Sequence, residues 1–385
     1  MTTFVAAMLA LPFVALPIAT ILRARRSRSL ADESPVPRSD APLVSLVIPA
    51  RNEARSIGRC VRSALAADYP RLEVVAVDDH STDSTGDILR SIAAGDSRLR
   101  LVVPPPLPPG WFGKQWACAT GADACTGEII GFLDADTTQA PDLVPRVVNA
   151  MLDANADMVT IGGRQELGSF WERLVQPQVF AVMLTRYGGT EIVNNSRRAS
   201  DKIANGQCIF VSRLTYAELD GHVAVRDKAA EDLALAQLWF TRGKRVVLLL
   251  GLEQLSTRMY TSLREIIDGW GKNVYAAGRS TIPFGVAGRV VFPLVLLMPG
   301  LCGIVPPVLL ILALAGWLGH GVLVWSAIVS ASNLAFWLAV YLWLGESPLY
   351  ALLSPLGSAM LVYIFGRSVA RGRRVEWKGR EYLVE

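Results

Sequence analysis

Charged residues are missing from two long stretches of this 385-residue chain. Met1–Leu22 contains none, and between Arg289 and Arg367 the only formal charge is Glu346. Hydrophobic residues make up 51% of the chain, which is too many for an ordinary soluble protein, and they are concentrated in these stretches. The remaining residues, about 260, have ordinary globular composition and suffice for one sizeable domain. The sequence therefore predicts a soluble domain between membrane segments.

A strong net charge, a cysteine framework and a dinucleotide motif are also absent. The net charge is +4, and the basic residues gather beside the apolar stretches, which is typical of a membrane surface and not of nucleic-acid binding. No G-x-G-x-x-G follows the first predicted strand, so a dinucleotide cofactor is disfavoured. The five cysteines lack metal-type spacing, and we expect small buried residues of a reducing compartment, without a role. They are Cys60, Cys118, Cys125, Cys208 and Cys302.

The first apolar stretch, residues 1–22, has the length of a signal peptide or a membrane anchor. A signal peptide carries its positive charges before the apolar run. Here Arg23, Arg25, Arg26 and Arg28 follow it, so the positive-inside rule predicts an anchor whose C-terminal flank is cytoplasmic. Residues 23–42 then form a basic, proline-containing linker.

Strand and helix patterns alternate after this linker. Short apolar runs bounded by turn formers predict strands, and amphipathic helical patterns lie between them. The predicted strands are 43–48, 73–77, 100–103 and 129–133. Nearly continuous apolar strands that alternate with helices predict an α/β fold with a doubly wound, mostly parallel sheet. In such sheets, ligands bind beyond the carboxyl ends of the strands.

Two carboxylates, Asp134 and Asp136, follow the strand 129–133 directly. Because alternate side chains of an extended segment point the same way, both can project together. They repel each other unless a cation lies between them, and oxygen ligands suit Mg²⁺ or Mn²⁺. The alternative is a helix N-terminus that uses Asp as a cap, since Thr137 and Thr138 follow.

Further polar residues follow the other strands at the same predicted edge. Pro49–Glu53 ends the first strand, and Asp78-Asp79 ends the second. We expect both segments to converge with Asp134 and Asp136. Helix capping is the alternative for Asp78 or Asp83 taken alone, but it explains the whole set poorly.

A second pair of acids opens a later helical pattern at 229–236. Glu231 and Asp232 suit the positive end of a helix dipole, and the local sequence favours this capping interpretation. A carboxylate there can also act as a general base toward a hydroxyl group. The apolar segment 169–187 fits equally a core helix and a helix in the membrane interface.

With these residues in place, the chain resembles the family 2 glycosyltransferases, which have a GT-A fold. The resemblance covers 43–273 and rests on the order of four blocks: Val47–Glu53, Val77–Asp83, Asp134-Ala135-Asp136 and Glu231-Asp232. It implies that a nucleotide is cradled by Pro49, Ala50, Arg51, Asn52, Glu53, Asp78 and Asp79. It further implies that Asp134 and Asp136 hold Mg²⁺ or Mn²⁺ on the diphosphate. Asp232, with Glu231 beside it, would be the base, which reverses the capping interpretation.

Other segments narrow the resemblance to the hopene-associated glycosyltransferases, with carotenoid-type and ceramide-type enzymes as near relatives. They are Pro109–Ala117, Arg258-Met259-Tyr260, Gly269–Asn273 and Trp377–Arg380. The Q-x-x-R-W of the processive synthases is absent, and Arg258 stands in that region as a candidate diphosphate ligand. This departure favours transfer of one sugar over polymerisation.

The resemblance implies an inverting, metal-dependent transfer from a nucleotide sugar, with UDP as the family default, to a lipid acceptor. Lys114 and the metal would stabilise the departing nucleoside diphosphate, although a lysine beside Trp111 and Trp116 can also pack along an aromatic surface. Two alternatives remain. One is transfer to a polyprenyl phosphate, whose ionised acceptor needs no base. The other is a non-catalytic membrane assembly protein with a transferase-like fold.

The C-terminal apolar region, 281–366, follows a catalytic domain predicted at 43–280. It contains the proline-interrupted segment 290–318, a good span at 322–344 and a shorter one at 349–365. The basic tail, 367–385, is predicted to be cytoplasmic, as is the catalytic domain, in a multi-pass protein of a bacterial-type inner membrane. Equal sidedness needs an even number of crossings, so we expect 290–318 to turn back or cross twice. The tail is a topology signal or returns to the catalytic face through Trp377–Arg380.

Overall fold

The computed structural model describes residues 2–280, 285–372, 374–377 and 380–383. The chain forms two compact units, each made of three separate stretches. A helical unit contains 1–26, 167–189 and 260–372, and an α/β unit contains 27–166, 190–259 and 373–385. The division differs from the predicted domain 43–280, because 167–189 and 260–280 belong to the helical unit.

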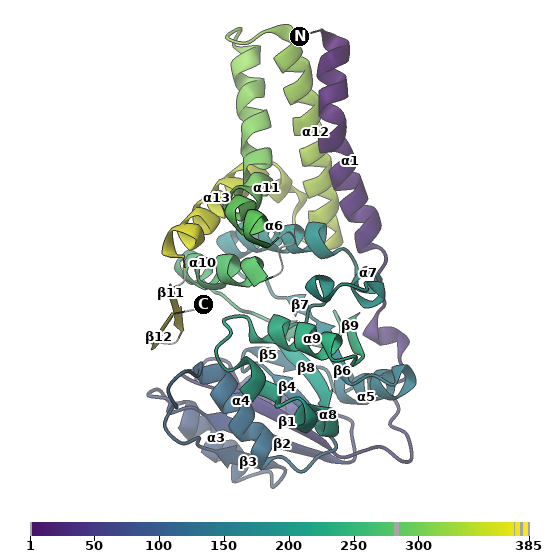
Figure 1. The fold of residues 1–385 in the computed structure, drawn as a ribbon, viewed down its shortest axis with the longest axis vertical. Coiled ribbons are helices and arrows are strands. Elements are labelled where there is room, and N and C mark those ends of the chain that lie inside the picture. The colour runs from purple at the N-terminus through teal and green to yellow at the C-terminus, as the bar shows by residue number, and fades with distance from the viewer. Residues whose placement is uncertain (1, 281–284, 373, 378–379, 384–385) are drawn as a thin grey trace. The chain divides into compact units, whose positions relative to one another are not determined.

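The α/β unit is built on a seven-stranded sheet of order β3-β2-β1-β4-β8-β6-β9 (Figure 1). All neighbouring strands are parallel except β8, which is antiparallel to both β4 and β6. The strands are β1 (Val44–Ala50), β2 (Leu72–Asp78), β3 (Leu99–Val102), β4 (Ile129–Leu133), β6 (Met158–Gly162), β8 (Cys208–Ser212) and β9 (Val246–Leu250). The prediction of an α/β fold with a mostly parallel sheet is confirmed.

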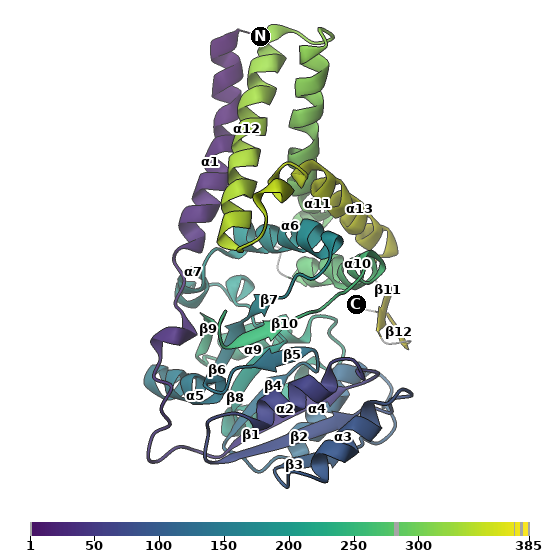
Figure 2. The same cartoon turned by 180° about the vertical axis from the view of Figure 1, so that it is seen from behind.

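Helices cover both faces of this sheet, as the alternating strand residues require. Leu46 and Ile48 of β1 pack with α2, α3 and α5, whereas Val47 packs with α4 and α9 on the other face. Figure 2 shows α2 and α3 in front of β1 and β2. The helices are α2 (Ile57–Leu65), α3 (Thr85–Ala93), α4 (Gly113–Ala124), α5 (Leu143–Ala154) and α9 (Glu231–Thr241). The two apolar layers fix the sheet, so the carboxyl ends of β1, β2 and β4 lie at one edge.

A second sheet and several short elements complete the α/β unit. The sheet has the order β5-β10-β7, in which β5 and β10 are antiparallel. Its strands are β5 (Thr137–Gln139), β7 (Arg164–Gln165) and β10 (Leu255–Thr257). The short helices are η1 (Leu30–Asp32), α7 (Thr190–Asn195), η2 (Ala199–Asp201), α8 (Arg213–Glu218) and η3 (Gly221–Val225). Leu30 is fully buried, so part of the predicted linker is folded against the domain.

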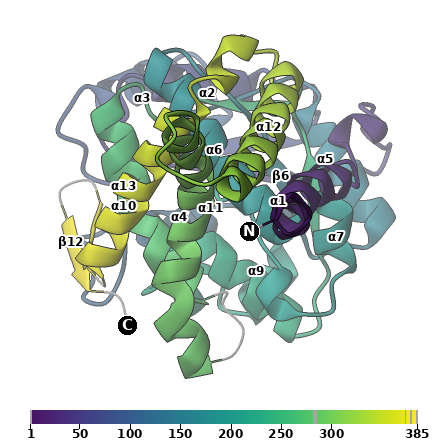
Figure 3. The same cartoon turned by 90° about the horizontal axis from the view of Figure 1, so that it is seen from above.

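Within the described residues, three helices of the helical unit are long and apolar enough to cross a membrane. They are α1 (Thr3–Ala24), α11 (Gly285–Leu314) and α12 (His320–Trp343). α1 lies beside α12, where Trp325 and Ser332 of α12 donate hydrogen bonds to carbonyls of α1 (Figures 1 and 3). The other helices are α6 (Phe170–Tyr187), α10 (Leu263–Ser280), η4 (Pro348–Ala351) and α13 (Ser354–Arg371). Leu174, Val175 and Val179 of α6 lie in an apolar cluster with α10, α11 and α13, so α6 is a packed helix of this unit.

The prediction that residues 290–318 turn back or cross twice is wrong. They belong to one helix, α11, which continues through Pro293, Pro299, Pro306 and Pro307. Pro306 leaves the carbonyl of Cys302 without its helical donor, and Asn333 of α12 donates to that carbonyl at 2.8 Å instead. A neighbouring helix therefore repairs the break that the prolines indicate.

The two glycines of α11 also have a packing role. A Cβ at Gly303 would lie 2.1 Å from Ser358 Oγ of α13, and one at Gly300 would lie 2.6 Å from Val362 Cγ2. These positions therefore let two helix backbones approach closely, as small residues do in membrane helices. The predicted span at 322–344 corresponds to α12, whereas α13, which covers much of 349–365, is not among the candidate spans.

Candidate active site

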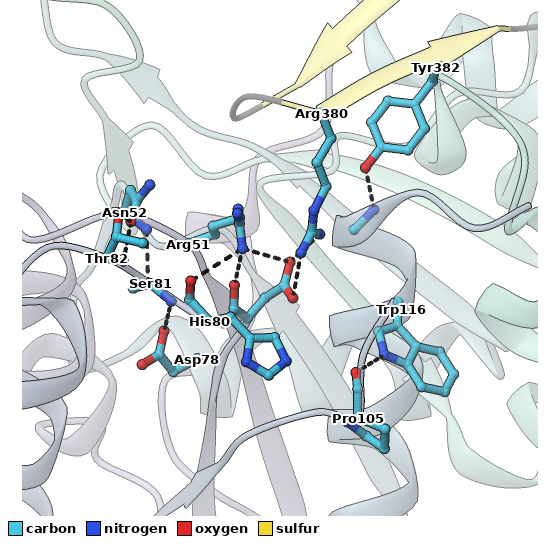
Figure 4. Close-up of polar contacts among 12 residues, drawn as sticks. Arg51, Asn52, Asp78, His80, Ser81, Thr82, Pro105, Trp116, Arg380 and Tyr382 are labelled. Carbon is cyan, nitrogen blue, oxygen red and sulfur yellow. Dashed lines mark hydrogen bonds and ion pairs between the residues drawn. The ribbon is translucent and has the colours of Figure 1, made fainter. Parts of the chain in front are cut away.

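Residues after β1 and β2 interlock at the edge of the sheet (Figure 4). Arg51 Nη1 donates to the backbone carbonyls of Asp79 at 2.5 Å and His80 at 3.3 Å. It also lies 3.9 Å from Asp79 Oδ2, and the Asp79 amide donates to the carbonyl of Ala50 at 2.8 Å. The guanidinium thus fixes the two segments against each other.

Asn52 and Asp78 complete this edge through backbone contacts. Asn52 has φ of 53°, a left-handed conformation that asparagine tolerates better than most residues. Its amide donates to Ser81 Oγ at 3.0 Å, and its side-chain oxygen accepts from the Thr82 amide at 2.8 Å. Asp78 Oδ1 accepts from the Ser81 amide at 3.1 Å. The predicted cradle is therefore a preformed pair of turns, while Asp78 itself supports the second turn.

Asp134 and Asp136 follow β4 on either side of the buried Ala135. Both aspartates are partly exposed, as expected for two side chains that project together from an extended segment. Neither caps a helix, because the segment continues into β5.

Lys114 connects Asp134 to the second acidic pair. Its ammonium lies 2.8 Å from Asp134 Oδ1 and 2.9 Å from Glu231 Oε1. Lys114 lies in the first turn of α4, and Glu231 is the first residue of α9. One cation thus bridges an acid after β4 and an acid from the opposite layer, and the side chain does not simply pack along Trp111 and Trp116, which pack against each other.

Asp232 is held by two backbone amides. Its Oδ2 accepts from Gly206 at 2.9 Å, and its Oδ1 accepts from Leu233 at 2.7 Å. A Cβ at Gly206 would lie 3.0 Å from Asp232 Oδ2 and 3.1 Å from Lys114 Nζ. The carboxylates of Glu231 and Asp232 therefore point toward Lys114 and Gly206, which a purely local capping role does not require.

The pKa values of the site follow from burial and from the shortage of cations. Burial and the charge of Asp134 raise the pKa of Asp136 to about 7. Burial and the charge of Glu231 raise the pKa of Asp232 to about 6. Burial would also raise the pKa of Glu231, but the Lys114 ammonium outweighs it and holds that pKa below its ordinary value. Asp232 is thus the acid of the pair that is poised to accept a proton near neutral pH.

The acids after β4 fit a divalent cation. Asp136 Oδ1 is buried and has no hydrogen-bond partner in the described part of the chain, an arrangement that costs free energy unless another ligand is present. No three His, Cys, Asp or Glu side chains among the described residues form a ready-made metal site. Asp134 and Asp136 would therefore hold Mg²⁺ or Mn²⁺ together with oxygen ligands that the protein does not supply.

Arg258 lies beside the same acids in the strand register. It follows β10, in which Thr257 pairs with Thr137 of β5, and Thr257 Oγ1 donates to the carbonyl of Asp136 at 3.3 Å. The antiparallel register places the backbone of Arg258 opposite that of Asp136.

Sequence reasoning missed Gly206 and left the role of the tail open. Gly206 was predicted only as the start of a strand, although an Asn-Gly pair at 205–206 is a turn signal. In the tail, Arg380 Nη1 and Nη2 lie 2.6 and 3.3 Å from the two oxygens of Asp79 (Figure 4). Arg380 therefore returns to the predicted site within the α/β unit, whereas Lys378 and Gly379 lie outside the described residues.

Helices on both faces of a mostly parallel sheet, with acidic strand ends at one edge, define a GT-A type of fold. A solved structure with a similar fold is the mannosyltransferase PcManGT from Pyrobaculum calidifontis, determined in complex with GDP-Man and Mn²⁺. The TM-score is 0.51 at 19% identity, over 96% of this chain and 98% of that one. This similarity confirms the predicted fold class.

Sequence comparison gives the family. Residues 45–214 match the model of glycosyl transferase family 2, and through this segment the chain belongs to that family. The 4,4'-diaponeurosporenoate glycosyltransferases of Staphylococcus haemolyticus and Staphylococcus aureus are 24% and 26% identical over 246 and 244 residues. These alignments cover 62% of this chain and 63% of each relative, so the chain spans less than two thirds of the relatives' length.

Proposed function

We propose that this protein is an inverting glycosyltransferase that moves a single sugar from a nucleotide-sugar donor to a hydroxyl group of a lipid acceptor. The observation that carries the proposal is the arrangement around Lys114 and Asp232. A candidate base, held by the Gly206 and Leu233 amides, lies beside a lysine that reaches the metal-type acids after β4. Family membership and the similarity to diaponeurosporenoate glycosyltransferases support the reaction class and a lipid-like acceptor.

The residues divide the chemistry among them. Arg51 and the turns around Asn52 and Ser81 would hold the nucleotide. Asp134 and Asp136 would hold Mg²⁺ or Mn²⁺, which when bound neutralises charge on the diphosphate leaving group. Lys114 would add a second positive charge there. Asp232 would take the proton of the acceptor hydroxyl as its oxygen attacks the anomeric carbon in line, while Glu231 keeps Lys114 in place.

The test replaces Asp232 by Asn. Because general-base catalysis contributes about 10²- to 10⁴-fold, transfer should fall by that factor. Nucleotide-sugar binding should stay intact, since the base acts on the acceptor. Nucleotide sugars would be screened on the purified protein with hopanoid and polyprenyl lipids in Mg²⁺ or Mn²⁺. Turnover at the wild-type rate in Asp232→Asn would remove the residue from this role. It would then favour an acceptor that is already ionised, such as a polyprenyl phosphate.

We further propose that the α/β unit is cytoplasmic and attached to a bacterial-type inner membrane by α1, α11 and α12. α11 and α12 give an even number of crossings between Glu166 and the tail, which matches the presence of both in one unit. Nucleotide sugars are cytoplasmic, and basic residues follow α1. Reporter fusions at His320 and after the tail should report opposite sides of the membrane. A common side would contradict this topology.

A further inference from the structure

The tail forms a β-hairpin that belongs to the α/β unit. Its strands are β11 (Arg374–Trp377) and β12 (Arg380–Leu383), and Trp377 pairs with Arg380. The unit assignment places this hairpin with Asp79, 301 residues earlier in the chain. The tail is therefore part of the fold that carries the proposed donor site, and its contacts there need an explanation.

The first contact covers Asp79. Its carboxylate is 1% exposed, and both oxygens accept from Arg380. The Arg380 side chain is 22% exposed. A ligand that reaches the end of β2 would therefore meet the guanidinium before it met the carboxylate. A carboxylate that engages both ends of the guanidinium fork also fixes the plane of the fork.

The second contact attaches the hairpin to α4. The Tyr382 ring stacks on Phe112 with centroids 4.0 Å apart and planes 13° apart. Its hydroxyl accepts from the amide of Gly113 at 3.2 Å (Figure 4). Gly113 precedes Lys114, so β12 is fixed both at the end of β2 and at the helix that supplies the lysine. Two separate anchors position Arg380 more closely than one ion pair would.

The location of Arg380 indicates which part of a nucleotide it would meet. β1 lies between β2 and β4 in the sheet, so the ends of β2 and β4 are about 10 Å apart at ~4.8 Å per strand. If Asp134 and Asp136 hold the diphosphate, a nucleoside extended toward β2 ends near Asp79. Arg51 and Arg380 both lie against this one carboxylate, which leaves the group of three with a net positive charge. A planar guanidinium can stack on a base and donate to its acceptor atoms.

We propose that Arg380 is a donor-binding residue: the C-terminal hairpin forms a wall of the nucleotide site, and Asp79 orients the guanidinium against the nucleoside part of the donor. The inference rests on the proposed function, because it needs a nucleotide sugar as substrate. It changes the expected role of Asp79, which becomes a positioning residue that acts through Arg380. It also makes the tail a determinant of nucleotide binding.

The experiment measures nucleotide affinity in the full-length, detergent-purified protein. UDP, GDP, ADP and CDP are titrated in Mg²⁺ to find the diphosphate that binds best, and the matching monophosphate is titrated next. Arg380→Ala should weaken both by a similar factor, of about fivefold or more, because stacking on a base is worth at least that much. Arg98→Ala is the matched control, since Arg98 also pairs with an aspartate, Asp96, but on the surface. Its affinities should equal those of the wild type.

Three results would overturn the inference. Unchanged binding in Arg380→Ala would remove the residue from the site. A loss confined to the diphosphate would place it at the phosphates, and tighter binding would show that the hairpin blocks the site. If the wild type bound none of the four nucleotides, the proposed function would fail together with the inference. Binding that is insensitive to Arg380 would sink the inference alone.

A second measurement needs no variant and covers the case in which Arg380→Ala misfolds. Amide hydrogen exchange of the wild-type protein is followed with and without the best nucleotide. If the hairpin is a wall of the occupied site, exchange at Arg380–Leu383 should slow when the nucleotide binds. Faster exchange there would mean that the hairpin leaves when the nucleotide arrives, which contradicts the inference.

Discussion

Replacing Lys114 by Gln removes the cation shared by Asp134 and Glu231. An opposite charge at such distances lowers a carboxyl pKa by about 1 to 3 units, and each unit corresponds to about 1.4 kcal/mol. The substitution should therefore raise the pKa of both acids and leave two poorly compensated negative charges at neutral pH. The expected loss of stability is about 1.4 to 4 kcal/mol for each carboxylate that stays ionised.

The pH dependence of this loss has a defined sign. In Lys114→Gln, the folded-state pKa values of Asp134 and Glu231 rise above those of the unfolded chain. Stability is then retained below the unfolded values, near pH 4, and is lost as the pH rises through the raised folded-state values. The midpoint of thermal unfolding should thus be close to that of the wild type at pH 4.5 and clearly lower at pH 8.

Lys244→Gln is the matched control for this series. Lys244 pairs with Glu218 at 2.6 Å, but Glu218 is 58% exposed, so the pair is screened by water and contributes little. Its unfolding midpoint should follow the wild type at every pH. If Lys114→Gln behaved in the same way, the two carboxylates would not depend on Lys114 for their charge balance, and our account of the site would be refuted.

Three further predictions concern the same residues. Asp136→Ala should abolish metal-dependent binding of the nucleotide sugar, because it removes the buried oxygen that lacks a protein partner; an unchanged titration in Mn²⁺ would contradict this. Transfer should decline as the pH falls through about 6, since the pKa of Asp232 is raised to that value and a protonated base cannot accept a proton; a rate that stays flat from pH 7.5 to 5 would exclude Asp232 as the base. Gly206→Ala should lower kcat by about 10- to 100-fold, because its Cβ would press on both Asp232 and Lys114 and small displacements are costly in catalysis; Gly243→Ala, whose Cβ would meet nothing within 4 Å, is a control for loss of glycine alone.

The sequence was sufficient for the parts of the fold that depend on local periodicity. Apolar strands of the expected length appear as β1, β2 and β4, and the acidic residues after them lie at one edge because parallel strands end together. The antiparallel direction of β8 was not predicted, since a buried strand has the same apolar pattern in either direction. The strands β5, β7 and β10 are two or three residues long, too short for any periodicity to register.

Other features depend on partners far away in the chain. Pro306 reads locally as a helix breaker, but Asn333 supplies the missing donor 31 residues away from the orphaned carbonyl. Glu231 and Asp232 look like an ordinary helix start until Lys114 and Gly206 are placed beside them. The contact between Arg380 and Asp79 leaves no periodic signal, so only the three-dimensional structure could place the tail there.

The separation of Asp79 and Arg380 also sets an order of events during synthesis. At about 5 to 20 residues per second, a ribosome needs roughly 15 to 60 s to make the 301 residues between them. All three apolar helices α1, α11 and α12 are made before the hairpin. The buried carboxylate of Asp79 therefore stays without its guanidinium until membrane insertion is under way, and a nascent chain that stalls in α12 would carry an unfinished nucleotide site.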